Sequence, residues 1–465
     1  MALALTHLPL TGLSEVEADV VNALSAQLDG FTAANRLKTA YYEGTKRLAD
    51  LGISIPPEMR HVDTVIGWPG TAVDVLEERL DFLGWASSTR DDYGLGAIFT
   101  ANNLGPESSM GHLDSLIYGV AFVATGAGDV TAGEPEVLVT VESPLSMTVA
   151  WSRRSRSVTA ALAINEVDPT TATATSITIY LPDETIRADR PGGVGSWKVS
   201  HRDRHDLGVV TVSRLVNRPW GAHRSGRSEI SRAVRALTDN AVRTLLGSEV
   251  AREFYSAPQR WVMGADESSF VDAAGNPVPA WQTYLGRVLA MSRDENGEVP
   301  EVGQFPASPP TPYWEAIRGL SQLFAAEAAM PVSYLGLISD NPASADAIKA
   351  GEVRLIKRSE RRHVQLGTGW KATAAHALMV RDGISRPPDG FADRISCAWR
   401  DPSTPTEAAS ADAATKLVAS GILPPDSPVT WDRVGLTQAQ QKRLEADNAR
   451  RRIETFAAEV AAEQP

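Results

Sequence analysis

The chain has 465 residues, a length typical of about three domains, and its 43% hydrophobic and 22% charged residues are those of an ordinary globular protein. A single cysteine, Cys397, excludes an intramolecular disulfide framework, and the formal net charge of −12 argues against a protein that grips DNA through clustered lysine and arginine. The chain shows no signal-peptide pattern and no apolar run of the ~18 residues that a membrane span needs, which predicts a soluble intracellular protein without a membrane partner.

Three helices are predicted in the first 125 residues. The first covers residues 13–51, with Ser14 as its cap and an apolar stripe of Val16, Val20, Val21, Leu24 and Leu28. The second runs from about Gly70 to Leu83. The third covers roughly residues 107–123.

From about residue 135 to 220 the pattern changes to the period-two alternation of strands. Turn clusters separate the predicted strands, which are residues 137–141, 147–151, 158–164, 176–180, 197–201 and 209–212. Because these strands follow one another without intervening helices, the sequence predicts an antiparallel sheet and an α+β fold.

A long two-faced helix follows, from Gly226 to Pro258. Ser228 is its predicted cap, and Pro258 ends it. One face is apolar and the other is charged, so Leu237, Ala241 and Leu245 are predicted to face a packed neighbour. Helices are also predicted at 313–329, from the loop 339–344 to about residue 376, and at two places after residue 405.

Two segments between these helices carry interaction residues. The stretch 264–312 is rich in glycine and proline and contains Trp281, Tyr284 and Phe305, aromatic anchors of the kind found in interfaces. The loop 339–344 is short and polar, and Asn341-Pro342 resists helix while Ser344 can cap the next one.

The chemical motifs predict no catalytic, metal or cofactor site. His201 and His205 lie in a segment that alternates like a strand and a turn, and Gly367–Gly369 with Lys371 lacks the frame of a phosphate loop. Cys397 is predicted to be a small buried residue. An enzyme whose site is assembled from scattered residues remains the alternative.

Two basic clusters are left. Residues Arg153, Arg154 and Arg156 are predicted to form a solvated hairpin tip. The other cluster makes one helix locally basic, and its members are predicted to contact DNA, to form ion pairs between subunits or to lie on a solvated face: Arg354, Lys357, Arg358, Arg361 and Arg362.

Several segments, in order from about residue 35 to 375, resemble the Gp6-like family of tailed-bacteriophage portal proteins. They are Tyr41–Gly44, Gly67–Trp68, Glu78–Leu80, Gly84–Trp85, Asp114–Gly119, Ser143–Leu145, Ile179–Asp183, Asn217–Pro219, Gly226–Ile230, Ala257–Arg260, Tyr334–Gly336 and Asn341–Ile348. Each motif alone is weak, but their order and spacing together are specific.

The resemblance implies a portal-type fold and a ring, usually of twelve subunits, at one capsid vertex. The implied parts are an N-terminal wing (1–227), a stem helix (228–262), a small clip (263–312), a second stem helix (313–330), a tunnel loop with a long wing helix (331–384) and a helical crown (385–465). The ring would be a channel for packaging and ejecting the genome, and the protein itself would not be an enzyme.

The resemblance also implies partners. These are double-stranded DNA in the channel, the terminase large subunit, a head–tail adaptor, and the major capsid and scaffold proteins. The protein would be assembled in the host cytoplasm and then reside in the virion. The tunnel loop would turn Asp340, Asn341, Ser344 and Lys349 towards the DNA. An acidic tube around DNA agrees with the net charge, since repulsion keeps the duplex centred.

Overall fold

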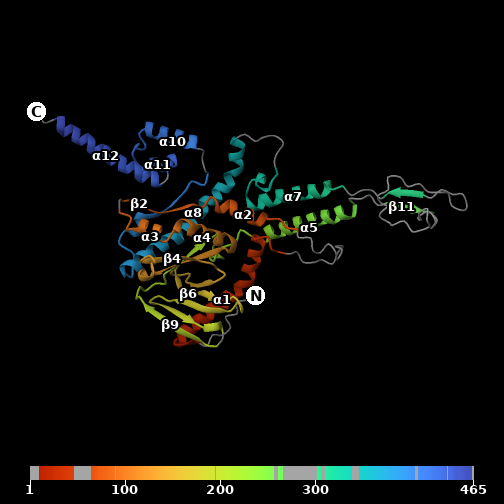
Figure 1. The fold of residues 1–465 in the computed structure, drawn as a ribbon, viewed down its shortest axis with the longest axis horizontal. Helices are drawn as coiled ribbons and strands as arrows, with labels where there is room; N and C mark the ends of the chain where they lie inside the picture. Colours follow the sequence, from red (N-terminus) through yellow and green to blue (C-terminus); the bar gives the residue numbers. More distant parts are fainter. Residues whose placement is uncertain are drawn as a thin grey trace, which may run out of the picture. The chain divides into compact units, whose positions relative to one another are not determined.

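The computed structural model shows a mixed helix and sheet protein (Figure 1). It describes residues 10–46, 64–89, 91–193, 195–255, 260–264, 301–304, 309–337, 345–403, 407–436 and 438–462. The chain forms two compact units, Met1–Arg400 and Asp401–Pro465. Within the described residues, no helix is both long and apolar enough to cross a membrane.

A six-stranded sheet with the order β1-β9-β8-β7-β6-β5 lies at one side of the first unit. Its pairs are antiparallel except β1 with β9. The strands are β1 (Leu10–Thr11), β5 (Met147–Trp151), β6 (Val158–Val167), β7 (Ala174–Tyr180), β8 (Glu184–Asp189) and β9 (Trp197–Arg204).

Helix α1 (Glu15–Tyr42) covers one face of this sheet. Ser14 and Glu17 form a capping box at its start, as the sequence predicts for Ser14. Val21, Leu24 and Leu28 are buried against the sheet, whereas Val16 is 73% exposed. The helix ends at Tyr42 and not at residue 51, because the backbone turns at Gly44, whose φ is +69°.

A second sheet packs on the other face of the first. It has the order β10-β3-β4, with β3 (Val120–Ala127), β4 (Val137–Glu142) and β10 (Val212–Val216). Ala161 and Ala163 of β6 meet Phe122 and Val212 across this contact. β6 is therefore buried on both faces, and the predicted single antiparallel sheet is two sheets packed together.

Helices close the opposite side of the three-stranded sheet. They are α3 (Leu95–Ala101), α4 (Leu104–Tyr118) and α8 (Ala345–Asp382). Leu116 of α4 and Trp370 of α8 are fully buried with Leu215 of β10 in the largest core cluster. The layers of the first unit are thus helices, the three-stranded sheet, the six-stranded sheet and α1 (Figure 1).

A small pair of strands forms where the sequence predicts the end of a helix. Helix α2 (Trp68–Glu77) stops before residue 83, and β2 (Phe82–Ser87) follows it. β2 pairs with β13 (Ile395–Trp399), which comes after α9 (Phe391–Arg394). Phe82 stacks on Trp370 with ring centroids 4.9 Å apart, so a distant aromatic cluster decides the conformation of this segment.

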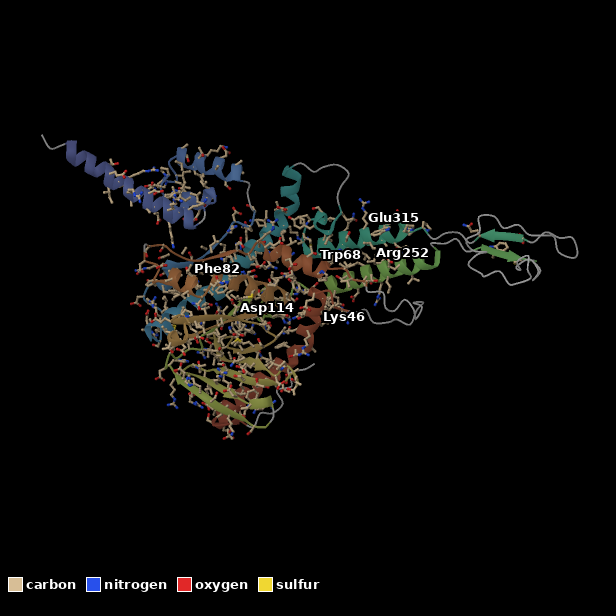
Figure 2. All side chains as sticks on the ribbon, in the orientation of Figure 1. Lys46, Trp68, Phe82, Asp114, Arg252 and Glu315 are labelled. Atoms are coloured by element: carbon tan, nitrogen blue, oxygen red, sulfur yellow. The ribbon has the colours of Figure 1, made fainter. Side chains whose placement is uncertain are left out.

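Two long helices, α5 (Arg232–Tyr255) and α7 (Thr311–Ala328), run side by side (Figure 1). Val234, near the start of α5, lies in one cluster with Phe324 and Ala328 near the end of α7. A Cβ added at Gly247 would lie 3.4 Å from the Tyr313 ring near the start of α7. The two helices are therefore antiparallel, and Figure 2 shows Arg252 of α5 and Glu315 of α7 at the same end of the pair.

The cap of α5 differs from the prediction. The Ser231 hydroxyl, and not that of Ser228, accepts the hydrogen bond from the backbone of Val234 at 3.2 Å. Ser228 instead donates to the carbonyl of Ile117, and Ile230 after it is buried in the core. Burial of this segment delays the start of the helix by one turn.

The remaining elements lie between the long helices, in short turns and in the second unit. Between the long helices, β11 (Arg260–Met263) pairs with β12 (Glu301–Gln304). Short 3-10 turns lie at Val130–Ala132, Pro191–Gly193 and Val332–Leu335. The second unit contains α10 (Glu407–Ala419), α11 (Pro428–Val434) and α12 (Gln438–Ala462). This unit begins at Asp401, whereas residues 385–400 include the strand that completes the β2 pair. The predicted crown, 385–465, stays a prediction.

Candidate functional site

A buried cluster of charges joins the start of α5 to the middle of α8. The Glu229 carboxylate accepts from Arg358 (2.6 Å) and Arg218 (3.1 Å) at one oxygen. At the other oxygen it accepts from Arg362 (2.5 Å) and from the Asn217 side-chain amide (3.1 Å). The Glu229 side chain is 4% exposed, so these ion pairs are shielded from water.

Three guanidinium groups surround this one carboxylate, which leaves two positive charges in excess. Burial alone would raise the pKa of Glu229, but Arg358, Arg362 and Arg218 lower it to about 2. Burial lowers the pKa of Arg358. The cluster is therefore permanently charged at neutral pH and depends on all of its members.

The loop before α5 holds this cluster in place. Asn217 and Arg227 exchange hydrogen bonds of 2.7 Å, and the Asn217 backbone donates to the Gly119 carbonyl at 2.9 Å. Gly226 has φ +90°, and a Cβ there would come within 1.9 Å of the Gly119 oxygen. Only glycine can come this close to the Gly119 carbonyl. This close contact holds the segments Asn217–Pro219 and Gly226–Ile230 against each other.

Sequence reasoning singled out these segments but missed their role. Neither Glu229 nor Asn217 is predicted as a site residue, because the ion pairs of Glu229 with Arg358 and Arg362 span 129 and 133 residues and leave no local pattern. The basic excess of the α8 segment was the one sequence feature that pointed to this cluster. Buried arginines need an acidic partner, and that partner had to come from another segment.

The structure divides the predicted basic residues of α8 into two groups. Arg358 and Arg362 face inward to Glu229, so Arg358 forms an ion pair within its own chain. Arg354 is exposed and donates to the Ala326 carbonyl at 3.2 Å, and Lys357 pairs with Glu360 at 2.5 Å. Arg361 is exposed.

The predicted packing residues of α5 also differ from one another. Ala241 is fully buried, and Leu237 packs on the cluster of Val234 and Phe324. Both residues therefore pack within their own subunit. Leu245 is half-buried. Leu237 is also half-buried, but it packs on that intrachain cluster, whereas Leu245 is the residue that we assign to a contact with another subunit.

Other predicted residues lie outside the described parts of the chain. These are Trp281, Tyr284, Phe305, Asp340, Asn341 and Ser344. Lys349 lies within α8, near its start. The tunnel-loop and clip assignments therefore stay predictions.

The remaining motifs lie on described elements of the first unit. His201 lies on β9, and Arg153, Arg154 and Arg156 lie in the exposed turn between β5 and β6. Burial raises the pKa of the Cys397 thiol to about 12, so the thiol stays protonated and unreactive. Among the residues that the structure describes, no group of three or more histidine, cysteine or acidic side chains could hold a metal.

Comparison with known proteins agrees with the sequence resemblance. The family model described as "Phage portal protein, SPP1 Gp6-like" matches residues 33–450. The portal proteins of Mycobacterium phages L5 and D29 are 32% and 33% identical over 431 and 428 residues, which cover 89% of this chain and 85% of each relative.

Solved structures with a more distant likeness include two necks of GTA particles. The neck of the empty particle, computed with C6 symmetry, has a TM-score of 0.43 and 13% identity over 80% of this chain and 90% of that one. The neck of the native particle, computed with C12 symmetry, has a TM-score of 0.39 and 12% identity over 83% and 95%. The sequence matches alone cover most of the chain, and the chain therefore belongs to the SPP1 Gp6-like family of phage portal proteins.

Proposed function

We propose that copies of this chain form a closed ring, of twelve subunits as the resemblance implies, through which double-stranded DNA enters and leaves the capsid. The observation that carries this proposal is the antiparallel α5–α7 pair. On α7, Trp314 and Leu323 are 59% and 61% exposed, and their nine-residue spacing places them on opposite sides of the helix. Large apolar side chains left exposed on one helix are typical of a surface that an assembly covers. A head-to-tail ring supplies that cover from the next subunit.

In this proposal α5 and α7 are the stem, residues 263–312 are the clip, and residues 401–465 form the crown. The two sheets, with α1, α4 and α8, form the wing. The clip would dock the terminase large subunit during packaging, and the ring would contact capsid, scaffold and head–tail adaptor proteins. The chain would not hydrolyse ATP, since the sequence has no Walker frame. It would be assembled in the host cytoplasm and stay at the portal vertex of the virion.

The net charge of −12 supports a conduit in preference to a tight DNA-binding protein. DNA phosphates bind proteins largely through lysine and arginine, and these contacts supply most of the affinity for DNA. A ring with an acidic excess repels the duplex from its walls on all sides. The genome can then pass in either direction without being held.

Electron microscopy of the purified full-length protein tests this function. We expect closed rings whose central hole is wide enough for duplex DNA. A chain that stays monomeric or dimeric at high concentration would contradict the proposal. Light scattering of the same sample measures the mass and thus the subunit number.

The tunnel loop has its own test. We propose that Asp340, Asn341 and Ser344 reach the channel axis, with Lys349 near the base of the loop. Replacing the first three with bulky side chains should leave rings intact but impair packaging or retention of DNA. Wild-type packaging by such rings, or a ring structure with residue 341 on the outer rim, would defeat this assignment.

The clip is tested by deletion. We propose that Trp281, Tyr284 and Phe305 contribute contacts to the neighbouring subunit and to terminase. A chain without residues 266–306 should fold yet fail to package DNA. Packaging at normal yield by this deletion would refute the clip assignment.

A further inference from the structure

The exposed face of α8 lies between two flanks of opposite charge. Val353, Lys357 and Val364 follow one side of the helix, and the two valines are 53% and 74% exposed. With about 3.6 residues per turn, Arg358 and Gln365 lie on one flank of this stripe, while Glu352 and His363 lie on the other. Each flank is in contact with a different part of the same chain.

The first flank is basic and is formed by the loop 218–227 beside α8. The Arg218 backbone donates to the Gln365 side chain at 3.2 Å, which fixes the loop against the helix. The loop contains Arg218, Arg224 and Arg227 and no acidic residue. Arg354 and Arg361 of α8 are exposed on the same side of the stripe.

An aromatic residue is held at the tip of this loop. Trp220 is 44% exposed, with the Arg227 guanidinium 5.2 Å from its ring and the His223 ring 4.5 Å away. Trp220 and His223 also exchange two backbone hydrogen bonds of 3.2 and 3.0 Å. Tryptophan and arginine on a rigid turn are the side chains that most often anchor protein interfaces. We call this surface, Arg218–Arg227 with Arg354 and Arg361, the basic flank.

The second flank is acidic and is formed by the end of α2. Arg79 pairs with Glu352 at 3.2 Å, and the Arg79 carbonyl lies 3.1 Å from the His363 ring nitrogen, which holds α2 against this side of α8. Glu78 and Asp81 are exposed here, and Glu77 lies beside them. Burial raises the pKa of Glu77, and the charges of Asp81, Asp74 and Glu78 add to the rise. We call Glu78 and Asp81, with Glu77 beside them, the acidic flank.

We propose that the basic flank of one subunit binds the acidic flank of a second copy of this chain, with Trp220 at the centre of the contact. The inference rests on the proposed ring and names the surfaces that close it. A head-to-tail interface needs two different, complementary surfaces on each subunit, and α8 carries one on each side. Opposite charges that meet across an interface favour this pairing and reject like-charged alternatives.

Charge reversal tests the pairing. The basic-flank variant is Arg224→Glu with Arg361→Glu, and the acidic-flank variant is Glu78→Lys with Asp81→Lys. All four side chains are exposed, and Asp81 loses only a surface pair with Arg400. The matched control is Arg153→Glu with Arg154→Glu, two exposed arginines on the β5–β6 turn. Circular dichroism checks that each variant keeps the wild-type helix content.

Mass photometry of wild type, control and variants gives the result. We expect rings from wild type and control, and a fall in the ring population of about tenfold or more for each flank variant alone. A 1:1 mixture of the two flank variants should restore rings, because alternating subunits then present opposite charges at every interface. Wild-type ring yield from either variant alone overturns the pairing, as does a mixture that stays unassembled. If the wild-type chain forms no ring, the proposed function itself fails, and this interface fails with it.

Discussion

Glu229 is the residue whose replacement we expect to destabilise the chain most. Glu229→Gln removes the one carboxylate that Arg218, Arg358 and Arg362 share and leaves three buried or half-buried cations without a counter-ion. Breaking a buried ion cluster in this way costs about 3–5 kcal/mol. Thermal and urea unfolding at a fixed protein concentration measure the loss. Glu360→Gln, which breaks an exposed pair with Lys357 on the same helix, should change stability by less than about 0.5 kcal/mol.

His112 makes stability depend on pH. It is fully buried, its Nε2 accepts from Trp370 at 2.9 Å, and burial with the nearby His363 lowers its pKa from 6.5 to about 3. Since the folded pKa lies below the unfolded one, the stabilisation is complete above pH 6.5 and is lost as the pH falls towards 3. Between pH 7 and 5 this loss is about 2 kcal/mol.

The variant His112→Gln tests whether His112 causes the loss of stability between pH 7 and 5. A glutamine oxygen can still accept from Trp370 but cannot take up a proton in this range. The variant should therefore lose about 2 kcal/mol less than wild type between pH 7 and 5, whatever its stability at pH 7. Glu229, whose ordinary pKa of 4.5 lies just below this interval, contributes only a small loss, and that loss is the same in both proteins. An equal loss in both proteins would exclude His112 as the source.

At the scale of elements, local patterns predicted much of the fold. Ser14 as a helix cap and the strand Met147–Trp151 are both confirmed. The predicted helix through Leu83 was wrong because Phe82 pairs with a strand more than three hundred residues later and stacks on Trp370. Helix and strand are close in local preference there, and a distant partner decides between them. For the same reason the Glu229 cluster could not be predicted from either of its segments.

The α5–α7 pair gives a prediction for assembly. Leu245 is a half-buried apolar residue of α5 that we assign to a contact with a neighbouring subunit, whereas Ala241 is fully buried within the chain. Leu245→Asp should therefore abolish rings while the helix content stays near wild type, because the charge is most unfavourable where the assembled contact removes the rest of the side chain from water. Asn240→Asp, at an exposed position of the same helix, is the control and should assemble normally. Rings of Leu245→Asp at wild-type yield would remove the stem assignment.

For the whole molecule, the boundary between the two units lies after the last residues that contribute to the core of the first unit. Residues 385–400 were grouped with the crown by sequence, yet β13 completes the β2 pair, and Phe391 and Ile395 are 4% and 2% exposed in the core of the first unit. The compact unit ends at Arg400, which pairs with Asp81 at 3.1 Å. A chain that ends at residue 400 should consequently keep the core of the first unit, whereas a chain that ends at residue 384 should lose part of it.

The chain 1–400 should fold with the thermal stability of the first unit in the full-length protein, since the truncation leaves its core intact. The chain 1–384 loses β13, unpairs β2 and exposes the aromatic cluster of Phe82 and Trp370. Burial of Phe391 and Ile395 alone contributes ~1.5–3 kcal/mol each, which is a large part of a domain's net stability. Differential scanning calorimetry of both truncations and the full chain measures this, with 1-anilinonaphthalene-8-sulfonate fluorescence reporting the exposed core. Equal stability of the two truncations would show that residues 385–400 belong with the second unit after all.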